Sequence, residues 1–191
     1  FGSFSGYDPT LFRNDGSNIF TSMGAPVPLY FGSASWNDYN QDGFADLLVV
    51  GNPGSGTVRR LYRNNGNNSF GDIGVSFPAD GATAWGDFDN DGDPDLLSSG
   101  SSGNLIYRNE GNNAFTALAA GLPNSPTGEA IWGDFNNDGY LDVIMMGAVG
   151  AGFQTRLFLN NNGGSFSDSG LTLPAVGGQI RCPPRSEERR V

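Results

Sequence analysis

The stretch AWGDFDNDGDPDLL at residues 84–97 places aspartates at alternate positions on both sides of Gly92 and ends in two leucines. Two further stretches align with it without a gap: SWNDYNQDGFADLL at residues 35–48 and IWGDFNNDGYLDVI at residues 131–144. Their first aspartates, Asp38, Asp87 and Asp134, are 49 and then 47 residues apart. Self-similarity at a nearly constant spacing indicates a repeat architecture, in which each repeat is one structural unit.

A second motif recurs out of phase with the first. It reads LFRNDG at residues 11–16, LYRNNG at 61–66, IYRNEG at 106–111 and LFLNNNG at 157–163. Asn-Gly and Asp-Gly between apolar runs indicate tight β-hairpins, because the central residues of such turns need positive φ angles. A phenylalanine follows each turn, at Phe20, Phe70, Phe115 and Phe166.

One repeat therefore predicts four short strands. The first ends at the tryptophan, the acidic loop follows, and the second strand is apolar. The third strand carries the Leu-Tyr-Arg-Asn pattern, and the fourth begins at the phenylalanine. Four strands in a period of about 40–50 residues are typical of a propeller blade, and no segment shows helical periodicity. The predicted fold class is all-β: a β-propeller of four-stranded antiparallel blades, with about three and a half blades in this chain.

The phase of the repeats divides the chain into five segments. We expect residues 29–75, 76–124 and 125–174 to be whole blades with an acidic loop each, residues 1–28 a partial first blade, and residues 175–191 an atypical tail. The charged, proline-rich tail is typical of a disordered end, with an arm that docks on a neighbouring copy as the alternative. Closed propellers have about four to eight blades, so this array has two open edges. The chain is then a fragment of a larger propeller, closes with a second copy, or stacks into a longer assembly.

The composition narrows the function classes. Twenty acidic and ten basic residues give a net charge of −10, which argues against nucleic acid as a partner. The chain has no histidine and one cysteine, Cys182, which excludes Ser-His-Asp and Cys-His triads and the usual zinc sites. No apolar stretch approaches about 18 residues, so we expect no membrane span. Eleven of the 20 acids lie in the three loops, where they repel one another unless a cation is present.

The loop spacing, Asp-x-Asp/Asn-x-Asp-Gly-x-x-Asp, predicts calcium sites. Side-chain oxygens at positions 1, 3, 5 and 9 and a backbone oxygen at position 7 converge on one cation, and Ca²⁺ takes roughly six to eight oxygen ligands in irregular geometry. The glycine at position 6 permits the sharp turn around the ion. Polar turns without a metal are the alternative interpretation, because Asp, Asn and Gly dominate turns. Three loops with one internal spacing favour three Ca²⁺ sites.

The predicted ligands form three sets, one for each loop. The second loop has the most carboxylates and is expected to bind Ca²⁺ most tightly. Phe44, Asp93 and Tyr140 are expected to contribute backbone oxygens. The side-chain ligands are Asp38, Asn40, Asp42 and Asp46 in the first loop, Asp87, Asp89, Asp91 and Asp95 in the second, and Asp134, Asn136, Asp138 and Asp142 in the third.

Aromatic and arginine side chains also recur at equivalent positions. Residues in repeat positions usually pack between neighbouring units, so we expect the aromatic residues to pack between blades, with stacking on a sugar as the alternative. We expect the arginines to pair with a neighbouring acid or carbonyl. The aromatic positions are Trp36, Trp85 and Trp132 with Tyr39, Phe88 and Phe135; the arginines are Arg13, Arg63 and Arg108, replaced by Leu159 in the last repeat.

The chain resembles the FG-GAP/VCBS repeats of integrin α-subunit propellers and of many secreted bacterial proteins. The resemblance rests on WGDFDNDGDPDLL at residues 85–97 and LYRNNG at 61–66, and it covers about residues 7–174. It implies acidic loops that bind calcium and a propeller that serves adhesion, recognition or scaffolding outside cells; some relatives are lectins. It implies no common catalytic residue. The chain departs from the family in its low blade number, its tail and the asparagine at the third position of two loops.

These observations predict a non-enzymatic, calcium-stabilised extracellular repeat module for adhesion, recognition or self-assembly, including a structural subunit of a surface or fibrous assembly. The expected location is extracellular or at the cell surface. The expected partners are other copies of the chain, an extracellular protein or a glycan. The alternative is a carbohydrate-binding lectin propeller. We do not expect an enzyme, because metal ligation accounts for the clustered acids and Glu129 is the only mild candidate for a catalytic acid among the others.

Overall fold

Every regular element in the described part of the chain is a β-strand. The computed structural model describes residues 11–23, 30–52, 58–77, 82–100, 104–123, 129–149 and 152–173. These ranges contain fourteen strands and no helix, so the prediction of an all-β fold is confirmed. None of the described residues forms a helix that is long and apolar enough to cross a membrane. The predicted tail at residues 175–191, with Cys182, lies outside the described residues.

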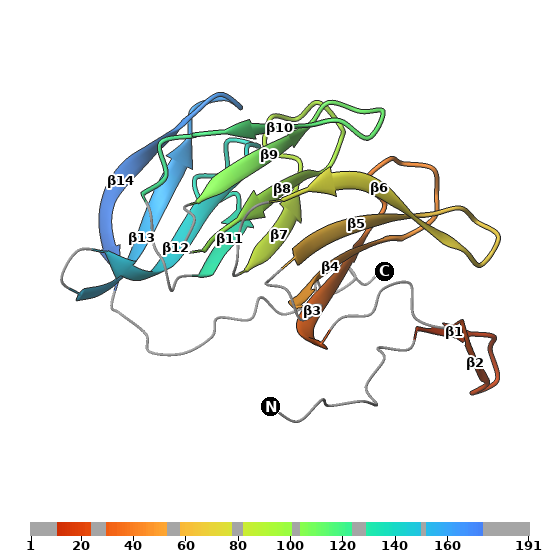
Figure 1. Ribbon diagram of the computed structural model, residues 1–191. Helices are drawn as coiled ribbons and strands as arrows, with labels where there is room; N and C mark the ends of the chain where they lie inside the picture. Colours follow the sequence, from red (N-terminus) through yellow and green to blue (C-terminus); the bar gives the residue numbers. More distant parts are fainter. Residues whose placement is uncertain are drawn as a thin grey trace, which may run out of the picture.

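Three sheets are four-stranded antiparallel meanders, in which each strand pairs with the next along the chain. Figure 1 shows these sheets side by side as consecutive blades, so the predicted propeller of four-stranded blades is confirmed. The sheets of the described residues do not close into a ring (Figure 1). The first blade comprises β3 (Tyr30–Asn37), β4 (Asp46–Asn52), β5 (Val58–Asn64) and β6 (Phe70–Ser76); the second β7 (Thr83–Gly86), β8 (Asp95–Ser98), β9 (Leu105–Asn109) and β10 (Phe115–Leu118); the third β11 (Glu129–Gly133), β12 (Asp142–Val149), β13 (Gly152–Asn160) and β14 (Phe166–Leu173). A separate hairpin comprises β1 (Phe12–Asn14) and β2 (Phe20–Ser22).

The acidic loops connect the first and second strands of each blade, and all three have the same backbone conformation. The fourth loop residue has a positive φ angle in each case: 56° at Gln41, 59° at Asn90 and 60° at Asn137. The glycines at the sixth position have φ angles from 86° to 99°. Glycine adopts this region without a steric penalty, which is why the turn uses it three times. The loops are therefore structural equivalents as well as sequence repeats.

Two hydrophobic cores form between consecutive blades. Leu48 and Leu61 of the first blade pack with Leu96 and Tyr107 of the second in one core. The other core joins the second and third blades through side chains such as Leu97, Ile106, Val143 and Phe158. Burial of apolar surface between sheets is the main favourable contribution in such an array, so each blade depends on its neighbours.

The aromatic residue at the second loop position carries this packing towards the next blade. Tyr39 is 1% exposed and its ring centroid lies 6.0 Å from that of Phe115. Phe88 is 0% exposed and stacks on Trp132 with centroids 6.2 Å apart. The prediction that these positions pack between blades is therefore confirmed for Tyr39 and Phe88. Phe135 has no following blade among the described residues and is 46% exposed.

The recurring tryptophan carries the packing in the opposite direction, towards the preceding blade. The indole N–H of Trp85 donates to Ser35 Oγ at 3.3 Å, and that of Trp132 donates to the carbonyl oxygen of Ala84 at 3.1 Å. Packing between blades is therefore confirmed for Trp85 and Trp132. Trp36, in the first blade, contacts Phe70 of its own sheet and is 49% exposed.

A buried asparagine at the end of the third strand ties the second blade to the first and the third blade to the second. Asn109 Nδ2 donates to the carbonyl oxygen of Pro94 in its own acidic loop at 3.2 Å and to that of Tyr39 in the preceding loop at 2.8 Å. Asn160 makes the equivalent pair of hydrogen bonds, at 2.9 and 2.8 Å. The sequence pattern predicts only a turn at this asparagine, and the structure adds its role between blades.

We expect Asn109→Ala to lower the free energy of unfolding by about 2–4 kcal/mol, because two buried carbonyl oxygens lose their donor. Asn161→Ala is the matched control, since among the described residues the exposed Asn161 side chain bonds only to neighbouring serines, and about 0.5 kcal/mol or less is expected there. Urea unfolding of both variants measures the difference. Equal losses would show that Asn109 has no special role between blades.

Gly86, at the end of β7, lies directly against side chains of the third blade. A Cβ atom at Gly86 would lie 2.7 Å from Leu141 Cδ1 and 2.8 Å from Trp132 Cδ1. We therefore expect Gly86→Ala to destabilise the protein by about 1–3 kcal/mol through steric strain. Gly164→Ala is the control, because nothing lies within 4 Å of a Cβ there. Thermal unfolding of the pair tests this, and a Gly86→Ala variant as stable as the control would contradict it.

Candidate metal centre

The ninth-position aspartate of each acidic loop is a buried clamp. Asp46, Asp95 and Asp142 are each 0% exposed. Oδ2 of Asp95 accepts a hydrogen bond from the backbone N–H of Phe88 at 3.1 Å, and Oδ1 accepts one from that of Asn109 at 2.8 Å. The other two aspartates accept from the equivalent N–H groups. Each carboxylate oxygen keeps a further lone pair, so a clamped aspartate can also ligate a cation.

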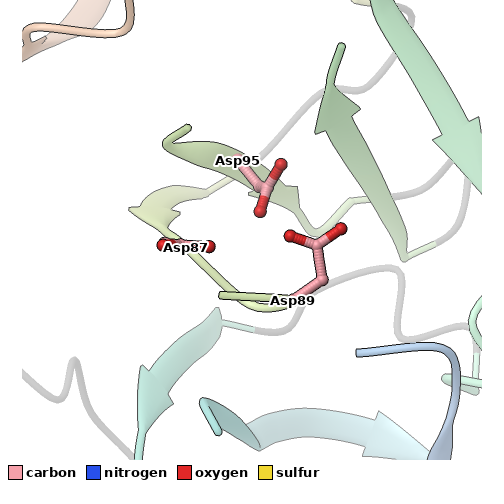
Figure 2. A group of neighbouring side chains, drawn as sticks. All are labelled: Asp87, Asp89 and Asp95. Atoms are coloured by element: carbon pink, nitrogen blue, oxygen red, sulfur yellow. The ribbon is translucent and has the colours of Figure 1, made fainter. Parts of the chain in front are cut away.

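Three carboxylates converge in the second loop. Figure 2 shows Asp87 and Asp89 on the loop and Asp95 at the start of β8; one oxygen of each lies within 4.8 Å of the others. Oδ1 of Asp87 and Oδ1 of Asp89 are buried and have no hydrogen-bond partner among the described residues. Burial of an unpaired carboxylate oxygen is unfavourable, which indicates a missing positive partner. Because Ca²⁺–oxygen distances are about 2.4 Å, ligands on opposite sides of one ion are about 4.8 Å apart, and the cluster fits Ca²⁺.

The electrostatics of the second loop also favour a bound cation. Burial is the main reason that the pKa of Asp95 is raised to about 7; backbone hydrogen bonds from Asn109 and Phe88 oppose the shift, and the charges of Asp89 and Asp91 add to it. Burial likewise raises the pKa of Asp89, and the charge of Asp91 adds to that shift. A divalent cation at this position would offset the repulsion and favour the ionised carboxylates.

The first and third loops are closed by hydrogen bonds of their own. Asparagine replaces aspartate at the third position: Asn40 Nδ2 donates to Asp42 Oδ2 at 3.1 Å, and Asn136 Nδ2 donates to Asp138 Oδ2 at 2.8 Å. Both oxygens of the first aspartate accept backbone N–H groups of the same loop. The side-chain amide in each of these loops therefore supplies a hydrogen-bond donor to a carboxylate, which Asp89 of the second loop cannot do.

The structure brings Asp87, Asp89 and Asp95 together among the predicted ligands. The other predicted ligands lie in the same three loops and make hydrogen bonds there, some of them to residues outside the loop, such as that of Asp42 with Arg63 and that of Asp93 with Gln41. In each loop the backbone N–H of the seventh residue donates to the aspartate at the fifth position. The predicted ligands outside the cluster are Asp38, Asn40, Asp42, Phe44 and Asp46 in the first loop, Asp91 and Asp93 in the second, and Asp134, Asn136, Asp138, Tyr140 and Asp142 in the third.

The recurring arginines pair with acids beside them, as the sequence predicts. The pair of Arg63 with Asp42, 3.1 Å between Nη2 and Oδ2, bears on the site because it partly neutralises a predicted ligand of the first loop. The first loop is therefore less in need of a cation than the second. The other two pairs are Arg13 with Asp15 and Arg108 with Glu110.

Glu129, the mild catalytic candidate from the sequence, lies in β11 and lines a cavity of about 410 Å³. Ser33, Ser35 and Thr83 line the same cavity, and no second acid lines it among the described residues. Glycoside hydrolysis commonly requires two carboxyl groups on either side of the scissile bond. This cavity offers one carboxylate in the part of the chain that is described, so it does not present such a pair.

Comparison with solved structures finds a similar fold in an Agrocybe aegerita lectin, whose structure is described as the basis of specific recognition of non-reducing terminal N-acetylglucosamine. The TM-score is 0.54 at 21% sequence identity, which shows a shared fold alone. The alignment covers 83% of this chain and 45% of that chain, so this chain spans less than half the length of the lectin. The comparison with curated proteins finds no match.

A family model described as an FG-GAP-like repeat matches the chain twice, over residues 38–98 and 87–145. Each match begins at the first aspartate of an acidic loop and includes the whole following connection to the next blade. The match therefore depends on the same loops that carry the candidate metal centre. Because the two matches together span residues 38–145, more than half of the sequence, this chain belongs to the FG-GAP-like repeat family.

Proposed function

We propose that this chain is a calcium-stabilised, non-enzymatic module for recognition or self-assembly outside the cell or at its surface. The observation that carries the proposal is the pair of buried oxygens, Asp87 Oδ1 and Asp89 Oδ1, which lie beside Asp95 and have no hydrogen-bond partner among the described residues. A hard cation that takes oxygen ligands fits their chemistry. Membership of the FG-GAP-like repeat family supports the same assignment.

All three loops are proposed to bind Ca²⁺ through the ligands predicted from the sequence, with the second loop binding most tightly. The first and third loops have the backbone conformation of the second, which supports one shared mode of binding. In these loops, reorientation of the side-chain amide presents Asn40 Oδ1 or Asn136 Oδ1 in place of a carboxylate oxygen. Three divalent ions add six positive charges and take the formal net charge from −10 to −4.

If the sites are weak, calcium stabilises the fold only in a compartment where its concentration is high. Extracellular calcium modules have dissociation constants of about 10⁻⁴ to 10⁻³ M. At an ion concentration about tenfold above that constant, each site adds roughly 1.4 kcal/mol to the free energy of unfolding. Three such sites are comparable to a large fraction of the stability of a small domain, so the module is expected to work where calcium is abundant.

We expect Ca²⁺ to raise the melting temperature of the wild-type chain and EGTA to lower it. Asp89→Asn should weaken Ca²⁺ binding at the second loop to the level of the other two loops in calorimetric titration and reduce the calcium-dependent stabilisation by up to about 1.4 kcal/mol, because an amide would then donate inside the second loop as it does in the other two. Asp72→Asn is the matched control, because Asp72 is a carboxylate outside the loops that pairs with Arg60. No calorimetric binding and an unchanged melting temperature in EGTA would sink the proposal.

A non-enzymatic role is supported by the repetition of the site. The same loop occurs in three consecutive blades, whereas a catalytic centre needs one distinctive set of groups. Glu129 lies outside the loops and lines a cavity, and its described neighbours there supply no second carboxylate. The acids of the loops are accounted for by metal ligation and by the clamp at the ninth position.

A lectin propeller is the second candidate function. The fold likeness to a lectin that recognises terminal N-acetylglucosamine favours it. Trp36 is half-exposed in a groove beside Asn64 and Asn68, and together they offer an aromatic face and amides of the kind that bind sugars.

On this second candidate, a glycan array that includes non-reducing terminal N-acetylglucosamine should show binding that Trp36→Ala reduces at least about tenfold, a loss of about 1.4 kcal/mol from the stacking face. Phe153→Ala is the control, because Phe153 is a 71% exposed ring away from that groove. If the chain binds no glycan on the array, the lectin proposal is rejected, and a protein is the remaining kind of recognition partner.

A further inference from the structure

The two ends of the described array carry complementary halves of one contact. The leading edge is the face of the first blade formed by Trp36, Asn64 and Phe70. The trailing edge is the face of the third blade formed by Phe135 and Asn137. Between blades one and two, and again between blades two and three, a trailing face of this composition meets a leading face of this composition. The chain therefore shows twice how its two outer edges can be matched.

The first element of the contact is an aromatic ring that enters a pair of rings on the next blade. Phe88 lies 6.2 Å from both Trp132 and Phe166, which are 6.1 Å apart, measured between centroids. On the leading edge, Trp36 and Phe70 are also 6.1 Å apart. A groove of about 480 Å³ opens beside them, and residues of the β1–β2 hairpin, Phe12 and Met23 among them, form its other wall. No aromatic acidic-loop residue of a preceding blade is described there. The leading edge is thus a preformed receptor for such a ring.

The trailing edge presents the ring that this receptor lacks. Phe135 occupies the loop position of Tyr39 and Phe88, which are fully buried, but it is 46% exposed. Its ring lies over its own loop, where a Cβ atom at Gly133 would be 2.8 Å from Phe135 Cε2. Exposure of a large apolar ring to water is unfavourable, and burial in an aromatic pocket would reverse that.

The second element is the hydrogen bond from the third-strand asparagine to the carbonyl oxygen behind that ring. Asn109 donates to Tyr39 O and Asn160 donates to Phe88 O, each at 2.8 Å. Asn64, the equivalent on the leading edge, donates to Ala45 O in its own loop and to no carbonyl of a preceding blade in the described ranges. Its remaining amide hydrogen is therefore the donor that would match the carbonyl oxygen of Phe135.

The third element joins the acidic loops directly. Gln41 Nε2 donates to the carbonyl oxygen of Gly92 at 2.5 Å, and Asn90 Nδ2 donates to that of Gly139 at 3.0 Å. Asn137 has the same positive φ angle as these two residues, and no described residue accepts a hydrogen bond from its side chain. On the leading edge, the counterpart of the two accepting carbonyls belongs to Gly43.

We propose that the trailing edge of one copy docks on the leading edge of a second copy of this chain. Phe135 enters the groove beside Trp36 and Phe70, while Asn64 donates to Phe135 O and Asn137 to Gly43 O. A second copy is the occupant because both halves belong to one chain and continue an interface that this chain already forms twice. The contact is heterologous, so it closes a ring or grows into a filament.

This inference deepens the self-assembly part of the proposed function and rests on packing between blades rather than on calcium. Its test uses Phe135→Asp, which removes the ring of the trailing edge, and Trp36→Glu, which blocks the leading edge. Ile19→Asp is the matched control, because Ile19 is 58% exposed in the β1–β2 turn and does not line the groove. Light scattering measures the mass of each protein and of an equimolar mixture of the two edge variants, at several concentrations, with Ca²⁺ and with EGTA.

The wild-type chain and the control are expected to grow with concentration in multiples of 20.1 kDa, whereas each edge variant stays monomeric. Their mixture should form a species of about 40 kDa, twice the 20.1 kDa of one chain, and nothing larger. Each variant supplies the edge that the other lacks, so recovery in the mixture also shows that both are folded.

A wild-type chain that stays monomeric, edge variants that assemble like the wild type, or a mixture that stays monomeric would each overturn the proposal. Calorimetry of the same samples keeps the two proposals apart: lost assembly with Ca²⁺ binding retained removes only the docking, whereas assembly without Ca²⁺ binding removes only the calcium module.

Discussion

Two backbone N–H groups, one from the start of an acidic loop and one from the third strand of the same sheet, donate to one buried aspartate in every blade. Asp46, Asp95 and Asp142 hold this position with no exposed surface. A carboxylate is tolerated there because charge-assisted hydrogen bonds replace its water. The clamp joins strand one, the loop, strand two and strand three in a single contact, so the metal ligands, the aromatic ring and the asparagine between blades all take their positions from it.

The residue at the third position of each acidic loop then decides how that loop balances its negative charge. Asn40 and Asn136 carry an amide that donates to the aspartate two residues later, and Arg63 adds a positive charge in the first loop. Asp89 has no such donor to offer, and its buried oxygen lies close to those of Asp87 and Asp95. One atom exchanged between an amide and a carboxylate thus separates a loop whose third residue donates a hydrogen bond from one with unpaired buried carboxylate oxygens, the candidate cation site.

Packing between blades makes every blade incomplete by itself. The core residues lie between consecutive sheets, and the ring, indole and asparagine contacts all cross from one blade to the next. In such quasi-one-dimensional arrays stability resides in nearest-neighbour interfaces, so the two outer faces retain the chemistry of an interface. The exposure of Trp36 and Phe135, at positions that are packed elsewhere in the array, is the direct consequence.

The repeated spacing by itself determined the strands, the turns and the family, because the φ angles of Asn-Gly and Asp-Gly turns and the alternation of apolar residues are local properties. It also located the acidic loops and predicted the pairing of the arginines. It predicted Asp95 as a ligand but not as the clamp that accepts two backbone N–H groups, nor did it predict that Asn109 reaches the preceding blade. Those roles depend on which groups meet across strands and blades and on how far they are buried. Only the tertiary structure decided them, because hydrogen-bond partners and desolvation arise from residues that are distant in the chain.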